Sequence, residues 1–241
     1  MGQIVMIDQR ARLSPLSLLR QQSWLSPTFP IGAYSYSHAI EWAVESGDIH
    51  DRKSLVQWLE ADLRYGSGRN EAIFFMEAWR CSKENDCKRL LEVAEFAAAF
   101  RATSEFALEA SQQATSCLAI LRRVWPDPIL DTLSDLLSEF CVAPTLSVVL
   151  GVRAARQDIP VTLALPSFLQ SYLVNFLTAG VRLVPLGQTD GQLSIADLEP
   201  AVMAVALQAS VATIDDVGSA AFMVDIASAS HETQYTRLFR S

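Results

Sequence analysis

The sequence has few of the residues that most often carry catalysis. Its 241 residues include three histidines, four cysteines without a C-x-x-C pair, and only 19% charged residues. No run matches G-x-x-x-x-G-K-[ST], the pattern whose backbone N–H groups hold nucleotide phosphates. The nearest approach to a G-x-S-x-G nucleophile elbow, GAYSY at 32–36, lacks the final glycine and the preceding β-strand. The sequence therefore predicts a protein without a catalytic centre of its own.

Basic charge is also scarce. The net charge is −8 and the isoelectric point is near 4.9, which argues against a nucleic-acid binder because phosphates require a basic face. The N-terminal run MGQIVMIDQRARLS has no apolar segment behind a basic start, so no secretory signal is expected. Met6 stands where N-myristoylation requires serine or threonine. We expect a cytoplasmic protein with reduced thiols.

Strand signals are nearly absent, whereas helix signals run along the whole chain. Leu55, Leu59 and Leu63 recur at helical spacing, and Asp51 and Thr103 stand where N-caps are expected. The predicted helices cover about 15–24, 35–47, 53–66, 70–85, 88–125 with a break near 103, 131–140, 144–155, 160–184, 192–212 with an interruption or kink at Pro200, and 216–227. We expect one all-α domain over 1–241, a bundle of about nine to eleven helices, with flexible segments at about 1–13 and 228–241.

One long stretch carries no charge, from Ile159 to Val181. About 20 apolar residues are enough to cross a bilayer, so a membrane span is one interpretation. However, Pro160, Pro166 and several polar residues interrupt the stretch, and helices that are apolar all round also occur in the cores of soluble bundles. We favour a buried core helix, at the centre of the bundle or at a dimer interface.

The most unusual short segment is SPTFPIGAYSYSHAIE at 26–41. Two prolines fix the backbone and Gly32 permits a positive φ, so the segment predicts a rigid turn that leads into a helix. Within that helix we expect Tyr36 and Ile40 to face inward. Tyr34 and His38 are expected on the surface.

A metal site is the main catalytic alternative. His38, Glu41 and Glu45 follow one another at i, i+3 and i+7, so they could share an ion on one helix face. A solvated face with a His–Glu contact is the simpler interpretation, and we favour it. The competing functions are a metal-dependent enzyme that uses His38 and nearby carboxylates, and a small-molecule-binding helical bundle.

Two further segments have unusual composition. RLVPLGQTDGQ at 182–192 is a polar turn bracketed by glycines, and SHETQYTRLFRS at 230–241 mixes arginines with Leu238 and Phe239, a pattern that favours docking on a partner. We expect Arg182 to cap its helix or to pair with a carboxylate such as Asp190. The alternative is a guanidinium that acts on a GTPase in trans.

Together these segments resemble the UreF family, urease accessory proteins whose first motif runs roughly S-P-x-L-P-x-G-x-F-S-Y-S-x-G-L-E. The resemblance extends from about Leu18 to Ser241 and includes all three segments in order. Phe29 replaces the common leucine, Tyr34 the common phenylalanine and Ala39 the glycine. His38 occupies a variable position, so the resemblance gives it no role.

The resemblance implies an all-α, cytoplasmic, non-enzymatic protein without a cofactor. It implies association with UreD, also called UreH, and with the GTPase UreG, typically as a homodimer in a larger assembly. That assembly docks on apo-urease, supports nickel insertion and lysine carbamylation, and is proposed to modulate GTP hydrolysis by UreG. Nucleotide and principal nickel ligands would then belong to UreG.

The resemblance also implies which residues belong to the motifs. We expect the C-terminal segment to become ordered on UreD through Leu238 and Phe239, with its arginines at the rim. The motif residues are Pro27, Pro30, Gly32, Ser35, Tyr36 and Glu41 in the first motif, Arg182, Pro185, Gly187, Gln188, Asp190, Gly191 and Gln192 in the second, and His231, Glu232, Arg237, Leu238, Phe239 and Arg240 in the third.

Overall fold

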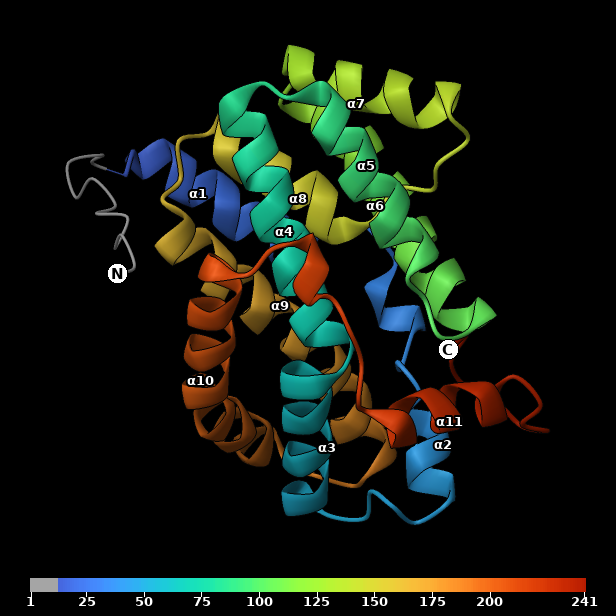
Figure 1. Ribbon diagram of the computed structural model, residues 1–241. Coiled ribbons are helices and arrows are strands. Elements are labelled where there is room, and N and C mark those ends of the chain that lie inside the picture. The colour runs from blue at the N-terminus through green and yellow to red at the C-terminus, as the bar shows by residue number, and fades with distance from the viewer. Residues whose placement is uncertain (1–12) are drawn as a thin grey trace, which may run out of the picture.

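The computed structural model describes residues 13–241, and within that range the chain forms helices and no strand (Figure 1). The all-α prediction is confirmed. The expected flexible N-terminal segment lies, apart from Leu13, outside the described residues. The α-helices are α1 Pro15–Trp24, α2 Ile40–Glu45, α3 Arg52–Tyr65, α4 Ser67–Glu84, α5 Cys87–Ala99, α6 Ser104–Val124, α7 Pro128–Glu139, α8 Leu146–Arg156, α9 Val161–Leu183, α10 Gln188–Val211 and α11 Phe222–His231; two 3₁₀ helices are η1 Ala33–Ser35 and η2 Ile214–Asp216.

Local capping explains several of the helix boundaries. The Asp51 carboxylate accepts a hydrogen bond from the backbone N–H of Ser54 at 2.7 Å, which begins α3 with a capping box. Thr103 accepts a hydrogen bond from the N–H of Phe106 at the start of α6. Because the first N–H groups of a helix have no partner within it, such side chains determine where the helix begins.

The predicted helix at 35–47 is the clearest exception. The structure has η1, then a break, and only then α2. The break lies at His38 and Ala39, whose φ angles are 54° and 65°. This left-handed conformation costs an ordinary residue roughly 1–2 kcal/mol, and helical periodicity gives no sign of it. The break turns the His38 side chain inward, so that its expected surface position is wrong.

The second motif also differs from expectation. The run at 185–192, predicted as a turn before a helix from about 192, is already helical from Gln188. The Asp190 carboxylate accepts a hydrogen bond from the N–H of Gly187 at 3.1 Å, which caps the earlier start. α10 then continues through Pro200 without interruption.

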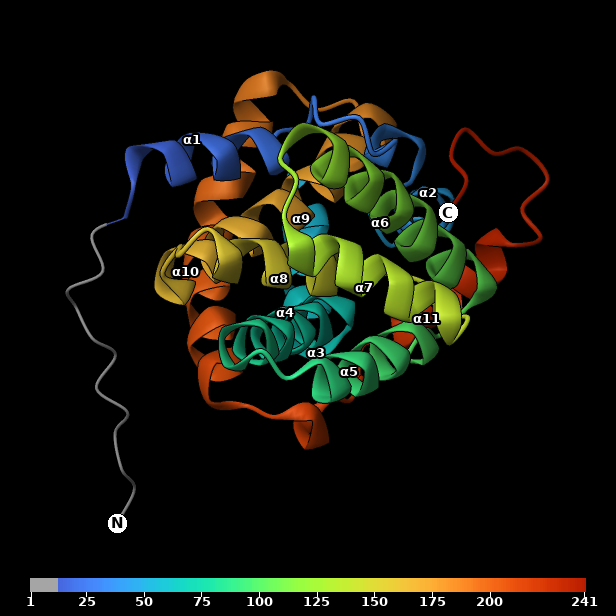
Figure 2. The same ribbon diagram turned by 90° about the horizontal axis from the view of Figure 1, so that it is seen from above.

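Helix α4 runs through the middle of the bundle, and its most extensive contact is with α8 (Figure 2). The two backbones approach closely at Gly151. A Cβ atom at this position would lie 2.5 Å from the carbonyl oxygen of Phe75 and 3.2 Å from the Cβ of Ala78. The small residue is therefore required by the packing of α8 on α4.

The two long apolar helices, α9 and α10, pack against each other. Each is long and apolar enough to cross a bilayer on length and composition, a test that the core helix of a soluble protein also passes. α9 contacts α2, α3, α4 and α8 as well and buries Leu165, Leu169 and Leu173. This packing agrees with the core-helix interpretation, although only 44% of its most apolar window is buried in the isolated chain.

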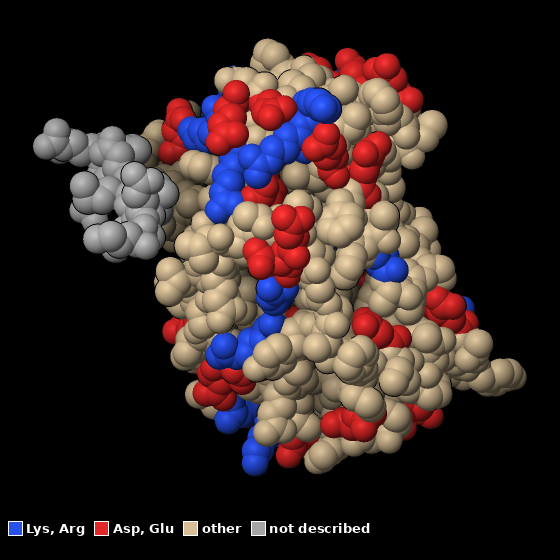
Figure 3. All heavy atoms as spheres, in the orientation of Figure 1, with Lys and Arg blue, Asp and Glu red and all other residues tan. Residues whose placement is uncertain are grey.

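Charged side chains are mostly compensated on the face that Figure 3 shows. Lys and Arg lie beside Asp and Glu there instead of forming a basic patch. In one network the buried Glu77 carboxylate pairs with both Arg80 and Arg89. This distribution agrees with the exclusion of a nucleic-acid surface on that face.

Candidate functional site

The first and third sequence motifs meet at one place, although they lie about 200 residues apart. After α11 the chain turns back and lies along the segment before α2. The N–H of Ser37 donates to the carbonyl oxygen of Ser241 at 2.8 Å, and the N–H of Arg240 donates to the carbonyl oxygen of Ser35 at 2.8 Å. We call the region where residues 231–241 pack on residues 35–41 the tail site. The expected flexible segment at 228–241 is thus packed on the chain itself in this structure.

Glu41 is the central acceptor of the tail site. Its carboxylate accepts hydrogen bonds from the backbone N–H groups of Leu238 at 2.7 Å and Phe239 at 2.9 Å. The Nε2 atom of His231 lies 3.1 Å from the same group. Glu41 is only 5% exposed. Hydrogen bonds to a charged acceptor are roughly twice as strong as neutral ones, so Glu41 is expected to be the strongest single hold on the tail at 238–239.

His231 lies between two carboxylates in the buried part of the site. Its Nδ1 atom is 2.7 Å from Glu105 of α6, opposite the Nε2 contact with Glu41. Arg237 donates to the other oxygen of Glu105 at 2.7 Å. The side chains of α2, α6 and the tail thus form one ionic cluster.

The second motif reaches the tail site through Arg182. Its guanidinium lies 4.6 Å from the ring centre of Phe239 and donates to the carbonyl oxygen of Tyr34 at 3.2 Å. Of the two expected roles, pairing with Asp190 is not found, because the Asp190 carboxylate caps α10 at Gly187. The Arg182 Nε atom instead donates to the carbonyl oxygen of Thr178 near the end of its own helix at 3.4 Å. A cation over an aromatic face at an exposed site contributes about 0.5–1 kcal/mol. Arg182 is therefore a positioning residue that covers Phe239.

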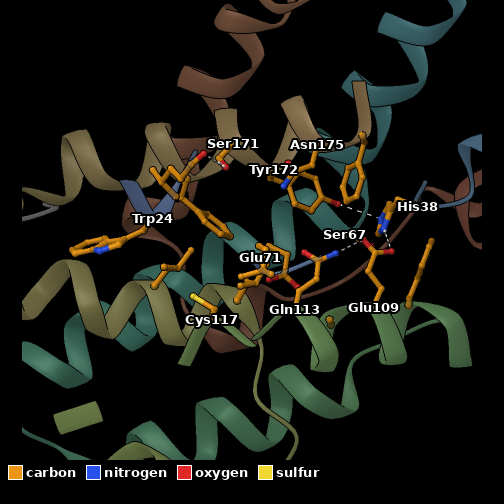
Figure 4. Close-up of a pocket in the computed structure, with 18 of the residues that line it drawn as sticks. Trp24, His38, Ser67, Glu71, Glu109, Gln113, Cys117, Ser171, Tyr172 and Asn175 are labelled. Atoms are coloured by element: carbon orange, nitrogen blue, oxygen red, sulfur yellow. Dashed lines mark hydrogen bonds and ion pairs between the residues drawn. The ribbon is translucent and has the colours of Figure 1, made fainter. Parts of the chain in front are cut away.

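His38 belongs to a second buried network beside the tail site. Its ring is stacked between Phe106 and Phe176, with ring centres 4.1 and 4.3 Å away. Its Nδ1 atom lies 3.3 Å from Glu109, and its Nε2 atom lies 3.3 Å from the hydroxyl of Tyr172 (Figure 4). These contacts come from α6 and α9, so the ring joins the two helices.

The network continues in both directions from His38. The Tyr172 hydroxyl donates to Asp62 at 2.7 Å, and burial, helped by this carboxylate, raises the pKa of Tyr172 well above 10.0. At the other end the Ser241 hydroxyl donates to Glu109 at 2.7 Å. A chain of hydrogen bonds therefore connects the end of α3 with the C-terminal residue.

The metal-site hypothesis requires His38, Glu41 and Glu45 to converge, and they do not. His38 faces Glu109, Glu41 faces the tail, and Glu45 is exposed. Within residues 13–241 no group of three or more His, Cys, Asp and Glu side chains is arranged to hold a metal ion. The left-handed turn at 38–39 separates the proposed ligands.

A cavity of about 70 Å³ borders the second network. Glu109 and Gln113 line it from α6 (Figure 4), and Arg101 and Glu71, which form an ion pair, line it as well. The sequence reasoning missed these residues and also Glu105. A signal was present, because Glu105, Glu109 and Gln113 recur at i, i+4 and i+8 on the buried face of α6.

The remaining motif residues lie around the site or on the nearby surface. Tyr36 donates to Gln112 at 2.6 Å, and Arg240 donates to the same oxygen at 3.3 Å. Glu232 accepts a hydrogen bond from the Ser104 hydroxyl at 2.6 Å. Gly32 has a φ of 75° before η1, and Gly191 is buried in α10. The exposed members are Pro27, Pro30, Pro185, Gly187, Gln188 and Gln192.

The His38 network predicts a pH-dependent stability. Burial lowers the pKa of His38, but Glu109 and Asp62 together raise it more than burial and Arg101 lower it, so the net pKa lies above the ordinary value of 6.5. A raised folded-state pKa stabilises the fold below the unfolded-state pKa, and this contribution disappears as pH rises through the folded-state value. We expect the free energy of unfolding of the wild type, measured in urea, to decline from about pH 6 to about pH 9. The His38→Gln variant should show a smaller decline. Equal slopes in the two proteins would contradict this assignment.

Comparison with known proteins gives a consistent family. The family model UreF matches residues 49–199. A protein of Bradyrhizobium sp. (strain BTAi1) is 47% identical over 225 residues, covering 93% of this chain and 92% of its own length. A Rhodopseudomonas palustris (strain BisB5) protein is 45% identical with 93% and 91% coverage, and one of Xanthobacter autotrophicus is 44% identical with 95% and 93% coverage. Each is named urease accessory protein UreF.

Proposed function

This chain belongs to the UreF family of urease accessory proteins, and on that premise we propose that it is a non-catalytic scaffold for urease maturation. In this proposal it binds UreD and the GTPase UreG on apo-urease, supports nickel insertion and modulates GTP hydrolysis by UreG. It acts as a cytoplasmic homodimer within that assembly. Family membership supports the accessory role, and the motifs of the resemblance support the partners.

The observation that carries the proposal is the geometry of the tail site. The tail backbone is fixed by Glu41, while two large side chains point away from the protein: Tyr235 is fully exposed and Leu238 is 79% exposed. A peptide that is already ordered loses less entropy on binding than a flexible one. The tail site therefore offers a preorganised apolar edge to a partner.

The geometry also refines which tail residue should contact UreD. Leu238 and Phe239 were both expected to do so, but Phe239 is 8% exposed and lies under Arg182. Leu238 is free. In the proposal Leu238 is the anchor for UreD, and Phe239 holds the tail on its own protein.

The test is co-purification with UreD after Leu238→Asp. Because the side chain is exposed, we expect an unchanged melting temperature and a loss of UreD binding of at least about tenfold, the size expected for a desolvated apolar anchor. Leu19→Asp on α1, where the side chain is 63% exposed, is the matched control and should bind UreD normally. Full UreD recovery with Leu238→Asp would reject the tail site as the UreD surface.

The maturation role itself has a separate readout. Co-expression of the chain with UreD, UreG and apo-urease should raise the nickel content of urease relative to co-expression without it. The Leu238→Asp variant should remove that gain, and Leu19→Asp should retain it. Equal nickel loading with and without the chain would contradict the proposed function.

A further inference from the structure

One face of α10 is apolar and uncovered. Leu193, Met203, Leu207 and Val211 are 49%, 57%, 72% and 80% exposed. With the exposed Ala196 and Pro200 they follow one another at intervals of three or four residues, the spacing of a helix-packing seam. We call the face formed by Leu193, Ala196, Pro200, Met203, Leu207 and Val211 the α10 seam.

The protein's own core does not account for this seam. α10 packs on α3, α4 and α9 through its opposite side, where Leu198, Ala201 and Val205 are buried. A surface helix normally places charged and polar residues on its outer face. Contiguous exposed apolar surface of this kind marks an interaction site in soluble proteins.

A groove runs beside the seam. It lies between α9 and α10, has a volume of about 260 Å³, and is lined by Leu173 and Leu177 on one side and by Val202 and Met203 on the other. From Leu193 to Val211 the seam extends about 27 Å at 1.5 Å per residue. A seam of this length fits one helix of about five turns, and the groove lies beside its middle part, between Ile195 and Met203.

The charges around the seam indicate what kind of helix fits. The only charged residues of α10 are Asp190, Asp197 and Glu199. Asp190 caps the helix at Gly187 and Asp197 pairs with Arg52 of α3, so the acidic side chain that stays open to a partner is Glu199. Glu199 also lines the groove. A second copy would bring another α10 with the same acidic residues, and like charges in contact are unfavourable. A helix with basic flanks is complementary.

We propose that the α10 seam is a docking surface for an amphipathic helix of another protein, with an apolar seam and Lys or Arg on its flanks. Figures 1 and 2 place α10 on the opposite side of the molecule from the C-terminus. The surface is therefore separate from the tail site and goes beyond the proposed function. Two docking surfaces on opposite sides allow the protein to connect two partners.

The test uses synthetic helical peptides of three heptads with leucine at positions a and d. One peptide carries lysine at e and g, and the other carries glutamate there. Fluorescence anisotropy with the full chain should show the lysine peptide binding at least about tenfold more tightly than the glutamate peptide, a difference of 1.4 kcal/mol. The Glu199→Lys variant should reduce that preference.

Two exposed substitutions locate the binding. Met203→Gln and Leu207→Gln should each weaken the lysine peptide several-fold without changing the melting temperature, and Leu19→Gln on α1 is the matched control. Leu238→Asp should leave peptide binding intact, so the tail proposal and this one fail independently. Equal binding of both peptides, or an equal effect of Leu19→Gln, would overturn the proposal. A dimer that Leu207→Gln converts to a monomer would assign the seam to a second copy and also overturn it.

Discussion

Replacing Glu41 with alanine is expected to release residues 232–241 from the protein and to destabilise the fold. The change removes the acceptor of the Leu238 and Phe239 N–H groups and leaves His231 with one carboxylate instead of two. Removing one partner of a buried ion pair typically costs about 3–5 kcal/mol. We expect the free energy of unfolding, measured in urea, to fall by this amount. We also expect faster hydrogen exchange in the tail, measured by mass spectrometry.

Two variants separate the role of Glu41 from a general effect on α2. Glu45→Ala changes an exposed carboxylate on the same helix and should stay within about 0.5 kcal/mol of the wild type. Glu41→Gln keeps an acceptor oxygen but removes the charge, so its loss should be intermediate. If the amides of residues 232–241 in Glu41→Ala exchange hydrogen at the wild-type rate, the Glu41 carboxylate does not hold the tail in place.

Substituting Gly151 with alanine is expected to produce the second large effect. The added methyl group would lie 2.5 Å from the carbonyl oxygen of Phe75, an atom of the α4 backbone that cannot move without shifting that helix. Overpacking of a core typically costs about 1–3 kcal/mol. Because α4 and α8 form the most extensive helix contact of the bundle, we expect a loss near the upper end, measured by urea or thermal unfolding.

Gly191→Ala is the matched control for that substitution. Gly191 also lies within a helix, α10, but the nearest atom to an added Cβ is the Val181 Cγ2 at an ordinary 3.6 Å. Alanine is preferred over glycine in helices by about 1 kcal/mol, so this variant should be neutral or slightly more stable. Equal losses of unfolding free energy in the two variants would show that the close contact between α8 and α4 does not require glycine at position 151.

The two surfaces suit a protein that connects others. The tail site has a fixed backbone and an exposed Leu238, whereas the α10 seam is a broad apolar helix face on the other side. Their chemistry differs as well, because Arg237 and Arg240 border the first and acidic residues border the second. Partners of opposite charge could therefore bind without competing.

Much of the fold was predictable because its signals are local. The Asp51 and Thr103 caps and the periodic leucines of α3 each depend on neighbours within about one turn, and the helices begin where those residues predict. Helical periodicity and the scarcity of strand signals were sufficient for the all-α class. The family resemblance likewise followed from three short segments, each of which can be recognised from its own residues without knowing what it packs against.

The site was different, because its contacts join distant segments. Glu41 and His231 are 190 residues apart, and periodicity shows which face of a helix is apolar without showing which segment packs on it. The surface position predicted for His38 was wrong because the left-handed turn at 38–39 directs the ring between Phe106 and Phe176, which belong to distant helices. Short-range propensities thus gave most of the helices, but not the ends of α2, α10 and α11. The pairing of buried charges came from the way those helices pack together.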